Sequence, residues 1–118
     1  MSMPDLVPTV QSRLVTFGVT EFAEDAPKSG SITFTLTHDL RRASSGVIIA
    51  AGTRTVHLVD GSGSIRLFTD MPDLMDDDGD KWAILVQKSW LPWPYPIRVP
   101  EGTTTISLAA ISVYDWRA

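Results

Sequence analysis

The side chains best suited to binding a metal ion are six aspartates gathered in one short segment. They are Asp70, Asp73, Asp76, Asp77, Asp78 and Asp80, out of 14 acidic residues in the chain. Clustered carboxylates bind Ca²⁺, but an EF-hand loop also needs alternating ligands, a glycine at its sixth position and a glutamate at its twelfth. Counted from Asp76, those positions hold Lys81 and Gln87, so the template is not met. We therefore expect a solvated acidic loop and no metal site.

A second group of candidate residues is aromatic. It comprises Trp90, Trp93 and Tyr95, which alternate with three prolines, and Trp116 near the C-terminus. Tryptophan and tyrosine are enriched at protein interfaces, and their rings also stack on other flat groups. Proline cannot donate a ladder hydrogen bond, so this segment is expected in a loop or an edge strand. We expect an interface or ligand surface here, although the rings could instead cap one end of the fold.

The remaining polar residues do not form a catalytic motif. The only histidines are His38 and His57, and His57 alternates with Val56 and Leu58, which places it on the polar face of a strand. No Gly-x-Ser-x-Gly motif lies in a strand–turn–helix context, and no glycine-rich loop opens a helix. We predict no catalytic residues, no metal and no cofactor, and we expect that the protein is not an enzyme.

Alternating apolar and polar residues predict the strands that must position these side chains. The clearest case runs from Thr53 to Leu67, where two alternating segments flank a Gly-rich turn, and predicts a β-hairpin with one buried face. Residues 15–19 and 32–36 alternate in the same way. From Trp82 to Val86 both faces are apolar, which indicates a central strand covered on both sides.

The spacing of these strands predicts the fold class. Turn residues recur roughly every 8 to 12 positions, and no helical period of useful length is present. This pattern is typical of a single immunoglobulin-like or fibronectin-type-III-like β-sandwich of about seven or eight short strands. We predict an extended N-terminal arm at 1–12, a β-sandwich domain at 13–111 and a C-terminal tail at 112–118.

Composition narrows the classes of function. The 118 residues suit one domain, and a net charge of −4 argues against a nucleic-acid partner. The absence of cysteine excludes disulfides and thiolate chemistry and favours folding in a reducing cytoplasm. No signal peptide or membrane-spanning apolar run is visible, and we expect the chain to be a complete gene product.

The order of several motifs resembles a known family. A first strand from Arg13 is followed by an acidic loop and then by Gly-Ser-Ile-Thr-Phe-Thr-Leu-Thr, which begins at Gly30. Next come the Thr55–Leu67 segment, the loop Asp70-Met71-Pro72-Asp73-Leu74 and a strand led by Trp82. The last motif is Val99-Pro100-Glu101-Gly102-Thr103-Thr104, which stands before the final strand. This order resembles a β-sandwich domain of minor tail proteins from tailed phages of actinobacteria. The resemblance runs from about Arg13 to Ile111, and the segment Trp90–Pro96 departs from it.

The resemblance implies a non-enzymatic structural component of a phage virion tail, at the tail tip or a fibre. Its partners would be other phage tail proteins, and tail symmetry implies a homo-oligomer on the order of three or six copies. The protein would fold in the host cytoplasm and reside in the virion, with no nucleic-acid or membrane partner. The alternative is a carbohydrate- or host-receptor-binding β-sandwich module that uses Trp90, Trp93 and Tyr95.

Overall fold

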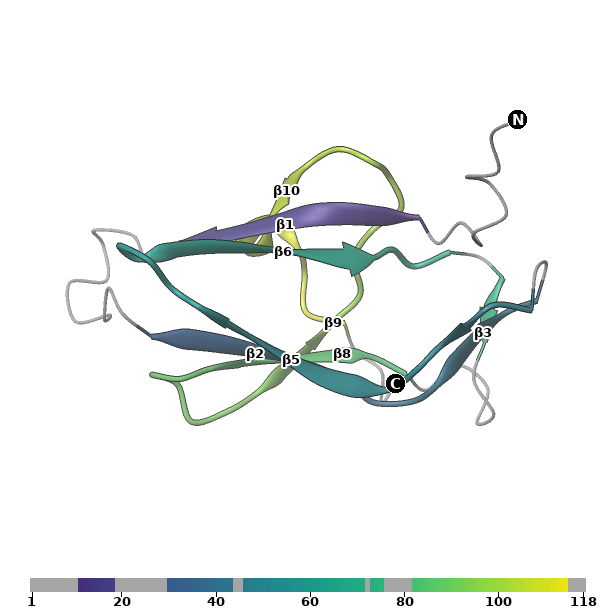
Figure 1. Cartoon of the computed structure of the whole chain (residues 1–118), viewed down its shortest axis with the longest axis horizontal. Coiled ribbons are helices and arrows are strands. Elements are labelled where there is room, and N and C mark those ends of the chain that lie inside the picture. The colour runs from purple at the N-terminus through teal and green to yellow at the C-terminus, as the bar shows by residue number, and fades with distance from the viewer. Residues whose placement is uncertain (1–10, 19–29, 44–45, 72, 76–81, 115–118) are drawn as a thin grey trace, which may run out of the picture.

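The computed structural model describes residues 11–18, 30–43, 46–71, 73–75 and 82–114, which form an all-β structure (Figure 1). These residues contain ten strands and a single short 3₁₀ turn, η2 (Leu108–Ala110). The predicted all-β class is therefore confirmed. The strands are distributed over three small sheets.

The first sheet, here called the β1 sheet, has the strand order β10–β1–β6. Its strands are β1 (Ser12–Gly18), β6 (Ser62–Phe68) and β10 (Ile106–Ser107). β6 pairs with β1 antiparallel, and β10 pairs with it in parallel. Val15 and Phe17 are buried, whereas Thr16 between them is less so, as the alternation in the sequence predicts.

The second sheet, the β2 sheet, has the strand order β5–β2–β8–β9 and lies opposite the β1 sheet (Figure 1). Its strands are β2 (Ser31–Leu36), β5 (Gly52–His57), β8 (Ile84–Lys88) and β9 (Tyr95–Ile97). β8 is an inner strand, as predicted. The proline-rich segment supplies β9 at the edge of the sheet, with Pro96 opposite Leu85, so its prediction as a loop or edge strand is confirmed.

The third sheet, the β3 sheet, has the order β4–β3–β7 and was only partly anticipated. Its strands are β3 (Leu40–Arg42), β4 (Ile48–Ile49) and β7 (Leu74–Met75). The apolar residues at 47–49 predict β4 as a short strand, whereas the polar residues at 38–46 predict a connection and residue 74 falls in the predicted acidic loop. With only two or three residues each, β3 and β7 are too short to show a period of two.

The predicted hairpin between Thr53 and Leu67 needs a correction. The tight turn is present, because Asp60 and Gly61 have φ values of 52° and 81° and Val59 and Ser62 exchange two main-chain hydrogen bonds. Beyond this turn, however, β5 pairs with β2 and β6 pairs with β1. The two strands therefore diverge into different sheets, and each covers the core from its own side.

The buried residues form two clusters. The larger one lies between the β1 and β2 sheets and includes Val15, Phe17, Ile32, Phe34, Leu58, Ile84, Val86, Ile97, Val99, Leu108 and Ile111. The smaller one lies beside the β3 sheet and comprises Leu40, Met71, Leu74 and Trp82. Leu36 and Phe68 pack against both clusters and so connect them.

Candidate functional site

The aromatic segment from Trp90 to Tyr95, which leads from β8 into β9, contains three rings in different environments. Trp93 is 77% exposed, and the neighbouring Leu91 is 42% exposed. Trp90 and Tyr95 are partly buried and pack against the larger core cluster. The structure thus leaves one indole free for contact and uses the other two rings in packing.

Trp90 is held in place by the close approach of Gly30. A Cβ atom at position 30 would lie 3.0 Å from Cε3 and Cζ3 of the Trp90 ring and 2.9 Å from Ser89 Oγ. Ser89 also donates its main-chain N–H to Ser31 O, and its Oγ accepts from Ser31 N–H at 3.1 Å. The base of the aromatic segment is therefore fastened to the start of β2.

Gln87 holds the next part of the segment. Its Nε2 donates to Leu91 O at 2.6 Å and to Lys88 O at 3.2 Å, and Leu91 N–H donates to Lys88 O at 3.0 Å. These bonds form a fixed turn before Trp93. An exposed indole on a fixed turn loses little conformational entropy when it is buried by a partner.

Tyr95 on β9 has a cation beside it. Lys88 Nζ lies 5.6 Å from the centre of the Tyr95 ring. Burial raises the pKa of the Tyr95 hydroxyl above its usual value, because the phenolate form is poorly solvated there. Trp116, the fourth aromatic candidate, lies outside the described residues.

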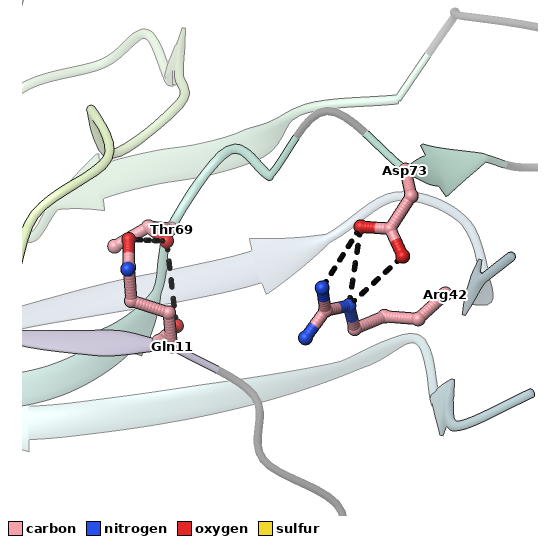
Figure 2. A network of polar contacts seen from close by, with 4 residues as sticks. All are labelled: Gln11, Arg42, Thr69 and Asp73. Atoms are coloured by element: carbon pink, nitrogen blue, oxygen red, sulfur yellow. Dashed lines mark hydrogen bonds and ion pairs between the residues drawn. The ribbon is translucent and has the colours of Figure 1, made fainter. Parts of the chain in front are cut away.

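The described aspartates of the acidic segment are next to arginines. Arg42 Nε lies 3.2 Å from both carboxylate oxygens of Asp73, and Arg42 Nη2 lies 3.1 Å from Oδ1 (Figure 2). Arg98 Nη1 lies 3.8 Å from Asp70 Oδ2. Four further aspartates of that segment, Asp76, Asp77, Asp78 and Asp80, lie outside the described residues. Where it is described, this segment uses its carboxylates to join elements of the fold.

A second polar network joins the start of β1 to two loops. Gln11 Oε1 accepts a hydrogen bond at 2.8 Å from Thr69 Oγ1 (Figure 2). It also accepts from Gly102 N–H at 2.8 Å, and Thr69 N–H donates to Gln11 O. Arg13 Nε donates to Thr104 O at 2.8 Å, and its Nη1 donates to Pro100 O at 3.1 Å. The loop between β9 and β10 is therefore tied to β1.

Sequence reasoning missed the role of Arg98. Its guanidinium carbon lies 3.9 Å from the centre of the Trp82 ring and 4.0 Å from that of Tyr114. Its Nε and Nη2 donate to Trp82 O at 3.1 and 2.8 Å. The available signal was an arginine between two apolar residues, Ile97 and Val99, at the end of a strand.

A cavity of about 370 Å³ opens where β5 and β6 diverge. Its apolar lining includes Phe34, Leu36, Ile65, Leu67 and Phe68, and Arg54 of β5 also lines it. The cavity therefore lies along the free edges of two sheets. Nothing in the sequence pattern indicated it, because it depends on β5 and β6 pairing with different strands.

Neither histidine lines the cavity. His57 is exposed on β5, and His38 Nδ1 lies 2.8 Å from Thr37 Oγ1. The described residues contain no group of three or more histidine and acidic side chains placed to hold a metal ion. They also contain no helix long and apolar enough to cross a bilayer. The chain matches no protein-family profile, and no curated protein is significantly similar to it.

Proposed function

We propose that this protein is a non-enzymatic structural component of a phage tail that docks onto neighbouring tail proteins. The observation that carries the proposal is Trp93, which is 77% exposed beside Leu91 on a fixed turn next to the edge strand β9. A large exposed ring on a rigid support is the kind of residue that dominates protein interfaces. The order of motifs from Arg13 to Ile111 resembles that of phage tail proteins, and for this reason we propose a phage tail as the assembly.

We also propose that the β1 and β2 sheets are the two halves of an immunoglobulin-like or fibronectin-type-III-like sandwich. The larger cluster draws Val15 from one sheet and Phe34 from the other, which supports this arrangement. The β3 sheet is then an addition at one end of the sandwich. In the tail, we expect on the order of three or six copies around the axis.

The test is the composition of virus particles made by the genome that encodes the chain. Mass spectrometry of purified particles should detect the protein, and Trp93→Ala should reduce its incorporation. Ile48→Ala is the matched control, because Ile48 is also an exposed apolar residue (67%) but lies on the β3 sheet. Particles that lack the protein, or that assemble and infect normally after deletion of the gene, would refute the proposal.

The alternative is a carbohydrate- or receptor-binding module. Because Trp90 and Tyr95 pack against the core, a sugar would stack mainly on Trp93. Titration of the isolated protein with host cell-wall glycans, followed by tryptophan fluorescence, distinguishes the two functions. Saturable quenching that is lost in Trp93→Ala, together with absence from particles, would favour this alternative.

A further inference from the structure

We infer that the cavity between β5 and β6 is a docking groove for one extended peptide strand, which adds to the free edge of β5 and places an acidic side chain beside Arg54. The inference rests on the proposed docking function for its biological setting. Its physical basis is independent of that function and lies in the two strand edges, the apolar floor and the position of Arg54.

The first argument concerns the main chain of β5. Leu58 N–H donates to Gly30 O, and the register pairs Val56 with Ile32 and Arg54 with Phe34. In an antiparallel pair, hydrogen-bonded and non-hydrogen-bonded positions alternate. Leu58, Val56 and Arg54 therefore bond to β2, whereas Thr53, Thr55 and His57 turn their N–H and C=O groups outward.

The side chains support this register. Thr33 Oγ1 lies 3.0 Å from Thr55 Oγ1, and Thr35 Oγ1 lies 3.1 Å from Thr53 Oγ1. Such close cross-strand contacts are typical of non-hydrogen-bonded pairs. In the described part of the chain, β5 ends the order of the β2 sheet, so no strand covers its outward groups.

The same reasoning applies to β6 on the other side of the cavity. Thr69 N–H donates to Gln11 O, which makes Leu67 and Ile65 the positions bonded to β1. Ser64, Arg66 and Phe68 then direct their main-chain groups away from β1. The cavity is thus bordered by two rows of main-chain donors and acceptors, which a peptide strand satisfies and a purely hydrocarbon ligand does not.

The floor of the cavity matches the inward face of such a strand. Leu36, Ile65, Leu67 and Phe68 are only partly buried, although they pack against the core. An apolar side chain at every second position of an added strand would cover them. A groove with this lining and this border fits an extended peptide with alternating apolar side chains.

Two cationic residues, Arg54 and Arg66, line the cavity, and Arg54 carries the charge preference on its core-facing side. Its cross-strand partner is Phe34, which is 3% exposed, so Arg54 lies on the core-facing side of the β2 sheet. Arg54 makes no hydrogen bond or ion pair with any residue that the structure describes. A carboxylate on the inward face of the added strand would be its complement, which selects acidic over basic peptides.

The test uses the isolated protein and two capped synthetic heptapeptides. The first has the pattern Thr-Val-Thr-Glu-Thr-Val-Thr, which puts both valines and the central glutamate on one face, and the second has lysine in place of glutamate. We expect the glutamate peptide to shift the amide resonances of β5 and β6. It should also slow hydrogen exchange at the outward amides of Thr53, Thr55 and His57.

The charge preference provides the decisive comparison. The lysine peptide should bind about tenfold more weakly, which corresponds to about 1.4 kcal/mol. Arg54→Glu should abolish the preference for the glutamate peptide, because one cation, Arg66, still lines the cavity. Arg41→Glu is the matched control, because Arg41 is exposed on β3 and outside the cavity, and it should leave the order unchanged.

Equal binding of the two peptides, no shift at millimolar peptide, or shifts confined to the Trp93 turn would each overturn the inference. Dodecanoate binding in the cavity without peptide binding would assign the site to a lipid-like carboxylate and would also overturn it. The outcome is separable from that for the virion proposal. Peptide binding with absence from particles refutes only the tail assignment, and incorporation without peptide binding refutes only the groove.

Discussion

At the scale of single residues, Arg98 combines hydrogen bonds, an ion pair and contacts with two aromatic rings. It is 9% exposed and lies between the rings of Trp82 and Tyr114, with two hydrogen bonds to Trp82 O. A buried guanidinium is stable only when its donors are satisfied, and here a main-chain carbonyl and Asp70 fulfil that role. The arginine thereby joins the loop before β8 to the segment that follows η2.

Arg98→Ala should lower the free energy of unfolding by about 3 kcal/mol, because it removes charged hydrogen bonds and two ring contacts. Arg98→Lys should recover only part of this loss, since an ammonium lacks the planar fork that reaches Trp82 O twice. Urea denaturation measures both changes. Arg41→Ala, at an exposed position, should change stability by less than about 0.5 kcal/mol. A loss below 1 kcal/mol for Arg98→Ala would show that the stack contributes little.

Phe34 tests the assignment of the core face of β2. It is 3% exposed, and its ring centre lies 5.8 Å from that of Phe17 on the opposite sheet. Phe34→Ala should cost about 3–5 kcal/mol by removing buried apolar area and leaving a cavity. Equilibrium unfolding in urea checks this value, with Ile48→Ala as the exposed control. An effect as small as that of the control would place Phe34 outside the core.

The buried hydroxyl group of Tyr95 should make the free energy of unfolding fall at alkaline pH. Its folded-state pKa is raised by burial, so the protein binds this proton more tightly when folded than when unfolded. The contribution of Tyr95 is therefore fully present below its unfolded pKa of about 10 and is lost as the pH rises through the folded value. Tyr95→Phe should flatten the fall of the unfolding free energy above about pH 10, as measured by urea titrations at several pH values. If the unfolding free energy of Tyr95→Phe fell with pH as steeply as that of the unmodified protein, burial would not raise the pKa of Tyr95.

At the scale of elements, β1 organises the sheet to which it belongs. It pairs with β6 along its whole length, with β10 in parallel, and through Arg13 with the loop between β9 and β10. β10 has only two residues, so its pairing with β1 depends on the position of the loop that leads into it, and Arg13 holds that loop. Gly102, with φ of 145°, lets the loop pass close to the Arg13 guanidinium.

Arg13→Ala should lower the free energy of unfolding by about 2 kcal/mol, because the main-chain carbonyls of the loop lose their hydrogen bonds to the guanidinium. It should also raise hydrogen-exchange rates at Gly102 and Ser107 more than in β8. Hydrogen exchange followed by NMR measures this difference. Arg66→Ala is the control, since the Arg66 side chain makes a single hydrogen bond among the described residues, to Ser12 Oγ at 3.4 Å. Uniform acceleration at all amides would mean that Arg13 affects global stability and not the loop.

At the scale of the whole molecule, the β1 sheet and the β2 sheet are connected near two of their edges. The turn bridged by Val59 and Ser62 links β5 to β6, and a bridge between Ile97 and Val113 links β9 to the segment after η2. Leu36 and Phe68 further couple the two core clusters. The Ile97–Val113 bridge and the packing of Leu36 and Phe68 join parts of the chain that are distant in sequence, so we expect the described residues to unfold as one cooperative unit.

Removal of divalent cations should leave the thermal stability of the whole chain unchanged. The described carboxylates Asp70 and Asp73 interact with Arg98 and Arg42, so metal is not needed to balance their charge. Differential scanning calorimetry with excess EDTA and then with excess Ca²⁺ should give the same Tm. Micromolar Ca²⁺ binding that disappears in Asp76→Asn or Asp78→Asn would contradict this expectation.

The sequence alone determined the features that depend on neighbouring residues. Alternation at 32–36 predicted β2 and its buried face, because side chains of a strand point to opposite sides in turn. The Gly-rich residues between two alternating segments predicted the tight turn, in which Asp60 and Gly61 adopt positive φ. The three prolines placed the aromatic segment at an edge, because they lack the donor that an inner strand needs.

Only the tertiary structure decided which strands are neighbours and what each exposed group faces. Alternation in β5 and β6 is the same whether they pair with each other or with β2 and β1, so the sequence could not distinguish a hairpin from two diverging strands. Trp90 and Trp93 also look equivalent in sequence, yet the close approach of Gly30 to Trp90 sets them apart. The contacts of Arg98 with the rings of Trp82 and Tyr114 form only when the chain folds. Local patterns report the direction of a side chain, whereas its partners depend on contacts between segments that are distant in the chain.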